Sequence, residues 1–254
     1  MRKKPRLLYM VTEDNQGVQM KKVIAIFGAG PGLGASIAER FGREGYAVAL
    51  IARGQDKLER LTSELEGHGV TAAPFVADLG QLNTIPSLIE RVRSTLGRID
   101  AICYAPATTE AFLPASQMTV EMMQTRIDYL FMGLVAAVNE VLADFRKNGG
   151  GAVLAGFGGS ASQGVPFMSG PAPAQSAARN YLMSLHGELA QENIHVGMVT
   201  LSGVIQGSAY HSSVENGDSD APTDFEMPLI DPAQLADQLW AVACGRGKVE
   251  YFFP

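Results

Sequence analysis

The chain has 254 residues, of which 46% are hydrophobic and 18% are charged, and this length and composition fit a single large α/β domain. The formal net charge of −6 argues against nucleic acid or an anionic membrane surface as the main partner. Two cysteines and four histidines show no metal-ligand spacing, so we expect no metal site. No apolar stretch is long enough to cross a membrane, and reduced packing cysteines are typical of a cytoplasmic protein.

Residues 1–19 differ in character from the rest of the chain. They hold a basic cluster and a short apolar run, and the first strong strand signal comes only after Lys21 and Lys22. We expect residues 1–19 to be a disordered arm, or sequence upstream of a start at Met20. Residues 20–254 then form one domain, because no linker or repeat divides them.

Strand and helix signals alternate in chain order. Four-residue spacing of apolar residues predicts helices between the first four strands, then at 119–147 and 174–192 and after Asp231-Pro232, where Asp is an N-cap. This alternation predicts a single doubly wound parallel sheet, a Rossmann fold with helices on both faces. Residues 207–230 are polar and irregular and predict a lid-like loop. The apolar runs that predict buried strands are 23–27, 47–52, 71–77, 99–105, 152–155, 195–201 and 248–253.

A glycine-rich turn, Gly28-Ala29-Gly30-Pro31-Gly32-Leu33-Gly34, separates the first strand from the first helix. At this place in a doubly wound sheet, missing side chains let a pyrophosphate approach the backbone, and the helix N-terminus faces its charge. The turn therefore makes residues 20–254 a Rossmann-type dinucleotide-binding domain. The alternative is a tight turn that binds nothing.

The residue at the end of the second strand indicates which dinucleotide is bound. An acid there would bond the ribose hydroxyls of NAD, but this strand ends in Arg53, with Lys57 one helical turn later. A guanidinium matches a 2′-phosphate in shape and charge. We therefore predict NADP(H) as the cofactor, and a solvated surface arginine is the alternative.

These motifs resemble the short-chain dehydrogenase/reductase family from about residue 23 to residue 253. The turn resembles that family's Gly-x3-Gly-x-Gly, Ala77-Asp78-Leu79 resembles its adenine-contacting segment, and Ser202-Gly203-Val204-Ile205 resembles its nicotinamide-side loop, which usually begins Pro-Gly. The resemblance implies a homodimer or homotetramer built on the helices at 119–147 and 174–192. The cofactor-binding residues that the motifs and the resemblance imply are Gly28, Gly30, Gly32, Leu33, Gly34, Arg53, Asp78, Leu79, Ala105, Gln175, Gly203 and Ile205.

The catalytic pair that this resemblance would imply is missing. The family uses Tyr-x3-Lys, in which the lysine charge lowers the tyrosine pKa, and an upstream serine orients the substrate carbonyl. No tyrosine in this chain has lysine four residues later, and no lysine lies between Lys147 and Lys248. No alignment can therefore restore the pair.

Alignment on residues 184–189, which resemble the end of the family's active-site helix, places Pro171 at the tyrosine position and Gln175 at the lysine position. Proline carries no acid, and glutamine can bond a ribose but supplies no charge. The serine position falls near Gly158, with Ser160 close by. The cofactor side of the resemblance is thus kept while the catalytic side is altered.

The remaining catalytic candidates are Tyr104, expected at the carboxyl end of its strand beside the nicotinamide, together with Ser160 and Gln175; Tyr210 and His211 in the loop are further proton donors to weigh. Three functions stay open. The chain is an NADP(H)-dependent oxidoreductase acting on a small organic substrate through a non-standard site, a non-redox enzyme that reuses the pocket, or a catalytically inactive NADP(H)-binding or partner subunit. An iminium or activated alkene would need less proton assistance than a ketone.

Overall fold

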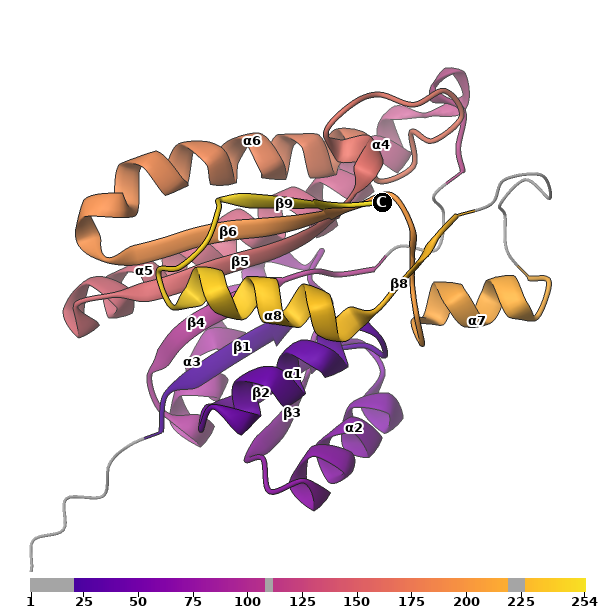
Figure 1. Cartoon of the computed structure of the whole chain (residues 1–254). Helices are drawn as coiled ribbons and strands as arrows, with labels where there is room; N and C mark the ends of the chain where they lie inside the picture. Colours follow the sequence, from indigo (N-terminus) through magenta and orange to yellow (C-terminus); the bar gives the residue numbers. More distant parts are fainter. Residues whose placement is uncertain (1–20, 108–111, 219–226) are drawn as a thin grey trace, which may run out of the picture.

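The computed structural model describes residues 21–107, 112–218 and 227–254, and the predicted arm at 1–19 lies outside them. A parallel seven-stranded sheet with the order β3-β2-β1-β4-β5-β6-β9 runs through the centre of the molecule (Figure 1). The predicted doubly wound α/β fold is therefore confirmed. The strands of this sheet are β1 Val23–Phe27, β2 Ala47–Ala52, β3 Ala72–Val76, β4 Ile99–Tyr104, β5 Gly151–Gly158, β6 Ile194–Leu201 and β9 Glu250–Phe253.

Helices pack on both faces of the sheet because its strands are apolar on both sides. In β1, Ala25 and Phe27 face a core shared with α3, α5 and α6, whereas Ile24 and Ile26 face a second core shared with α1, α2 and α8. The helices are α1 Leu33–Arg43, α2 Gln55–Gly67, α3 Ile85–Leu96, α4 Val120–Ile127, α5 Gly133–Asn148, α6 Ala172–Leu189, α7 Ala209–Glu215 and α8 Pro232–Ala243, with short 3₁₀ turns at Leu82–Thr84, Ala115–Gln117, Gly159–Ala161 and Ala190–Glu192.

Two predicted elements differ from the structure. The helix predicted at 119–147 consists of α4, a π-helical turn Asp128–Met132 and α5. The stretch at 207–230 is not wholly irregular, because it holds α7 and ends in a short strand, β8 Leu229–Ile230, which pairs with β7 Val204–Ile205. The predicted N-cap is confirmed, since the Asp231 carboxylate accepts the Ala233 N–H at 2.9 Å.

A buried ionic group ties the last strand to the rest of the sheet. The Glu250 side chain is 4% exposed and accepts two hydrogen bonds from the Arg179 guanidinium, at 2.8 and 2.6 Å. The Thr200 hydroxyl donates a third at 2.7 Å. These bonds join α6, β6 and β9 behind the carboxyl edge of the sheet, and the paired carboxylate raises the pKa of Arg179.

Replacing Glu250 with alanine should lower the free energy of unfolding by about 3 kcal/mol, because the variant leaves the Arg179 charge without its partner. Chemical denaturation measures this change. Glu192→Ala is the matched control: Glu192 pairs with Arg146 at the surface, at 2.6 Å and with side chains 36% and 55% exposed, so it should hardly move the denaturation midpoint. Equal shifts for the two variants would contradict the expected role of the buried pair.

Candidate active site

The carboxyl ends of the parallel strands lie along one edge of the sheet, and β1 and β4 are neighbours there although they are not consecutive. The strand order runs from β1 through β2 to β3 on one side and continues with β4 on the other side of β1. Such a reversal of strand order opens a crevice in doubly wound folds. A cavity of about 260 Å³ lies at this point. Of the predicted cofactor residues, the cavity is lined by Gly28, Gly30, Leu33, Gly34, Ala105, Gln175, Gly203 and Ile205.

The first glycine of the turn allows the backbone to come close to the next strand. Gly28 has φ 94°, and a Cβ atom there would lie 2.6 Å from Cα of Pro106. Its N–H and that of Ala29 donate to the Ile51 carbonyl at 2.9 and 3.0 Å. The turn is therefore fixed between the ends of β2 and β4, and only glycine fits its first position.

Gly30 differs from Gly28 because it faces open space. A Cβ atom added to Gly30 would have no neighbour within 4 Å, so here the missing side chain leaves room in the cavity. Helix α1 begins just after, with no side-chain cap and no acidic residue in its first turn. Uncapped N–H groups and the positive end of the helix therefore remain available to an anion, and the turn fits a dinucleotide pyrophosphate.

The other predicted cofactor residues, Gly32, Arg53, Asp78 and Leu79, do not line this cavity. Arg53 and Asp78 are exposed and follow the carboxyl ends of β2 and β3 on the same edge of the sheet. The Arg53 guanidinium lies 5.7 Å from the centre of the Tyr129 ring. The Asp78 carboxylate accepts the Gly80 N–H at 3.0 Å, so its side chain is held by its own turn.

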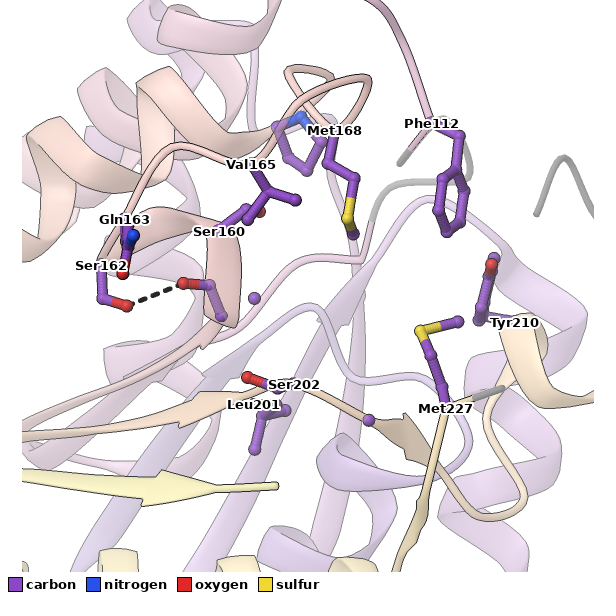
Figure 2. Close-up of a pocket in the computed structure, with 14 residues that line it drawn as sticks. Phe112, Ser160, Ser162, Gln163, Val165, Met168, Leu201, Ser202, Tyr210 and Met227 are labelled. Atoms are coloured by element: carbon purple, nitrogen blue, oxygen red, sulfur yellow. Dashed lines mark hydrogen bonds between the residues drawn. The ribbon is translucent and has the colours of Figure 1, made fainter. Parts of the chain in front are cut away.

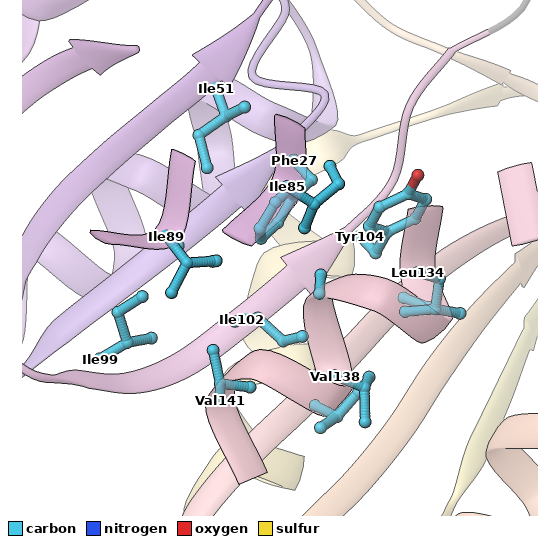
Figure 3. Packing of buried hydrophobic residues seen from close by; sticks show 14 of the residues in the cluster. Phe27, Ile51, Ile85, Ile89, Ile99, Ile102, Tyr104, Leu134, Val138 and Val141 are labelled. Atoms are coloured by element: carbon cyan, nitrogen blue, oxygen red, sulfur yellow. The ribbon is translucent and has the colours of Figure 1, made fainter. Parts of the chain in front are cut away.

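The structure corrects the expectation for Tyr104, which is 1% exposed and does not line this cavity. Its ring lies in the core beside Phe27, with ring centres 5.6 Å apart (Figure 3). The hydroxyl donates to the Tyr129 carbonyl at 2.6 Å. That carbonyl is available because the Gly133 N–H bonds Asp128, five residues back, in the π-helical turn. Burial raises the pKa of Tyr104, so this phenol serves packing and does not transfer protons.

Gln175 stands in the cavity wall as the alignment predicted, and it is buried at 8% exposure. Its side-chain carbonyl accepts the Gly158 N–H at 3.1 Å. The amide thus fixes the end of β5 at the point where the strand enters the site. Its NH₂ group adds a hydrogen-bond donor that carries no charge.

A second cavity, of about 490 Å³, adjoins the first (Figure 2). Ser160 and Pro171, the residues predicted from the serine and tyrosine positions, both line it. The two cavities are neighbours, because they share four lining residues. These are Gly158, Leu201, Gly203 and Tyr210.

Sequence reasoning missed most of the second cavity. Phe112, Val165, Met168 and Met227 line it but come from connecting segments whose patterns carry no periodic signal. The one available hint was apolar residues in otherwise polar loops.

His211 does not line either cavity. Its Nδ1 atom accepts a hydrogen bond from the Gly207 N–H group at 3.3 Å. The structure therefore does not support His211 as a proton donor.

Tyr210 is the single titratable side chain among the described residues that line the two cavities. It lies at the start of α7 and lines both cavities.

Over the described ranges, no three His, Cys, Asp or Glu side chains gather to hold a metal ion. Burial raises the pKa of the Cys103 thiol to about 12, which keeps it protonated and inert. None of the described helices is long and apolar enough to cross a membrane.

A doubly wound sheet with a glycine turn at its switch point defines a dinucleotide-binding class of protein. Within that class the chain belongs to the short chain dehydrogenase family, whose model matches residues 22–216.

Curated relatives and solved structures agree with this assignment. A dehydrogenase/reductase SDR family protein 7-like of Drosophila melanogaster is 29% identical over 184 residues, 70% of this chain. An uncharacterized oxidoreductase of Bacillus subtilis is 26% identical over 219 residues, 86% of this chain. The chain spans 56% and 61% of the lengths of these two relatives.

Two solved structures share the fold at low sequence identity. L-sorbose reductase from Gluconobacter frateurii, complexed with NADPH and L-sorbose, has a TM-score of 0.77 at 24% identity, covering 92% of this chain and 95% of its own. A short chain oxidoreductase from Pseudomonas aeruginosa PAO1 that contains an atypical catalytic center has a TM-score of 0.78 at 17% identity, covering 91% and 95%.

Two glycine variants should separate folding from nucleotide binding. Gly28→Ala should lower the free energy of unfolding by about 2 kcal/mol or more, because it meets backbone atoms at a positive φ. Gly30→Ala should leave stability unchanged but weaken NADPH binding about tenfold, since its methyl group enters the cavity. Thermal unfolding and NADPH fluorescence titration measure the two effects. A Gly30→Ala variant that binds NADPH like the wild type would contradict the placement of the pyrophosphate.

Proposed function

We propose that the chain is an NADP(H)-dependent oxidoreductase that acts on a small organic substrate through a non-standard catalytic site. The observation that carries the proposal is a pair of adjacent cavities at the same sheet edge, of which one is lined by the glycine turn and the other offers further space. One side offers the backbone of a pyrophosphate site, and the other offers space for a substrate. The family relationship and the NADPH in the solved sorbose reductase support the same function.

Arg53 supports NADP(H) over NAD(H). It is exposed at the end of β2 and forms no ion pair with any described residue, its one ring contact being with Tyr129. A free guanidinium beside the ribose position attracts a 2′-phosphate. The Tyr129 ring holds the guanidinium through a cation–π contact without neutralising it.

The nicotinamide, when bound, would supply or accept a hydride. Gln175 would hold the ribose side of the site through its amide, and Ser160 would orient the substrate oxygen across the crevice. Pro171, at the position where the family has its tyrosine, can neither give nor take a proton. Tyr210 would therefore donate the proton that the substrate gains, from the α7 side of the crevice, and recover it from solvent.

A second candidate function is an NADP(H)-binding subunit without turnover, and the exchange of both Tyr and Lys for Pro171 and Gln175 favours it. NADPH oxidation in the presence of carbonyl, imine and enone compounds distinguishes the two functions, because a binding subunit would not consume the nucleotide. The family relationship also supports a homodimer or homotetramer, which sedimentation velocity would test.

Replacing Arg53 with aspartate should weaken NADPH binding about tenfold or more while NADH binding changes little, because only NADPH carries the phosphate that the arginine attracts. Fluorescence titration with both nucleotides measures the ratio. Arg246→Asp makes the same charge change after α8, at the opposite end of the sheet, and should alter neither affinity. Equal weakening of both nucleotides by Arg53→Asp would refute the phosphate assignment.

Replacing Tyr210 with phenylalanine should lower kcat about a hundredfold and leave the NADPH dissociation constant unchanged, because the ring remains and only the proton donor is lost. Steady-state kinetics on any substrate found in the panel, with NADPH titration alongside, measures both constants. Tyr104→Phe removes a buried hydroxyl from the core and should retain kcat. The assignment fails if the loss of activity follows Tyr104 and not Tyr210.

A further inference from the structure

The larger cavity carries no full charge on any described residue that lines it. From this and from the arrangement of its walls, we propose that the cavity selects a neutral, amphiphilic substrate with an apolar ring system and one polar end bearing oxygen. The inference rests on the proposed function, since it names the substrate class of the same site.

One end of the cavity is apolar and built to accept a ring. Phe112, Met168, Met227 and Tyr210 gather there and point toward one another across the opening (Figure 2). Aromatic rings and thioethers make favourable contacts with flat apolar groups, and methionine adapts its shape to them. This end lies opposite the polar wall and away from the sheet.

The other end of the cavity is polar but uncharged. Ser160 and Ser202 line it, and their hydroxyls form no hydrogen bond within the described chain. The Ser162 hydroxyl is already engaged, because it donates to the Gly159 carbonyl at 2.8 Å. Two unengaged hydroxyls at one end of an otherwise apolar cavity suit a single oxygen function on the substrate.

Apolar side chains continue from the cavity to its rim. Val165 lines the cavity and is 40% exposed, and Phe167, two residues later, is 69% exposed. Phe167 also adopts φ 64°, a left-handed conformation that costs energy in a bulky residue.

Charge selectivity follows from the cost of desolvation. A carboxylate or ammonium group that enters this cavity loses water and finds no described side chain of opposite charge to compensate. A neutral carbonyl loses much less and can accept a hydroxyl bond from the polar wall. The cavity volume of about 490 Å³ lies within the range of sites that bind compounds of drug size.

Three naphthalene compounds of nearly equal size test the proposal: 2-acetonaphthone is neutral, 2-naphthoate is an anion and 2-naphthylmethylammonium is a cation. Binding is measured by calorimetry on the full chain saturated with NADPH, with L-sorbose as a polar neutral probe. We expect the affinity of the ketone to be at least about tenfold higher than that of either ion. We also expect the ketone to bind more tightly than the sugar.

Two lysine variants test whether the preference comes from this cavity. Met168→Lys places a cation at the apolar end, so 2-naphthoate should gain affinity relative to the ketone and the order of the two should reverse. Val120→Lys adds the same charge at a position that is 80% exposed and lines neither cavity, and should leave the order unchanged. Thermal unfolding confirms that both variants are folded.

The outcomes separate this proposal from the proposed function. If an ion or the sugar binds as tightly as the ketone, or if no probe binds while NADPH does, the substrate class is wrong and the cofactor assignment stands. If NADPH itself does not bind, the proposed function fails, while ketone preference measured without nucleotide would still support a neutral amphiphilic ligand. If Met168→Lys and Val120→Lys shift the order alike, the preference does not arise in this cavity.

Discussion

The close approach of the glycine turn to the end of β4 is the constraint on which the site depends. Gly28 lies against Ala105 and Pro106 so closely that a Cβ atom would come within 2.6 Å of the neighbouring backbone. Parallel strands with both faces buried bring their carboxyl ends to one edge, and this contact fixes two of those ends relative to each other. The remaining groups of the crevice, from α1 to Gln175, are arranged around that fixed pair.

Charge is distributed unequally about this edge of the sheet. Behind it, Arg179 and Glu250 form a buried pair that Thr200 completes, and such a pair fixes one arrangement of α6, β6 and β9. Within the crevice the described lining has no ion at all. The Gln175 amide holds β5 through the Gly158 N–H, where a lysine would have carried a charge. Among the described residues, the ionic group therefore supports the sheet, and the lining of the two cavities carries no full charge.

Sequence patterns predicted the strands well because the central ones are continuous apolar runs whose neighbours bury both faces. They also predicted the glycine turn, where the constraint is local and falls on one residue type. The role of Tyr104 could not be predicted, because it depends on a π-helical turn 25 residues later that frees the Tyr129 carbonyl. The apolar end of the second cavity was missed for a similar reason: Phe112, Met168 and Met227 come from three separate connections and meet only in the folded chain.

The replacement of the family's lysine by Gln175 bears on catalysis and on substrate recognition together. A lysine beside the reacting centre would lower the pKa of a phenol and would also attract anionic substrates. Without it, the described lining of the two cavities carries no cation that would assist proton donation by Tyr210 or attract an anionic compound. Such a site suits a substrate that needs little proton assistance and that gains most of its binding energy from apolar contact. Under the proposed function, the absence of the usual catalytic pair and the apolar side chains of Phe112, Met168 and Met227 therefore suit the same kind of substrate.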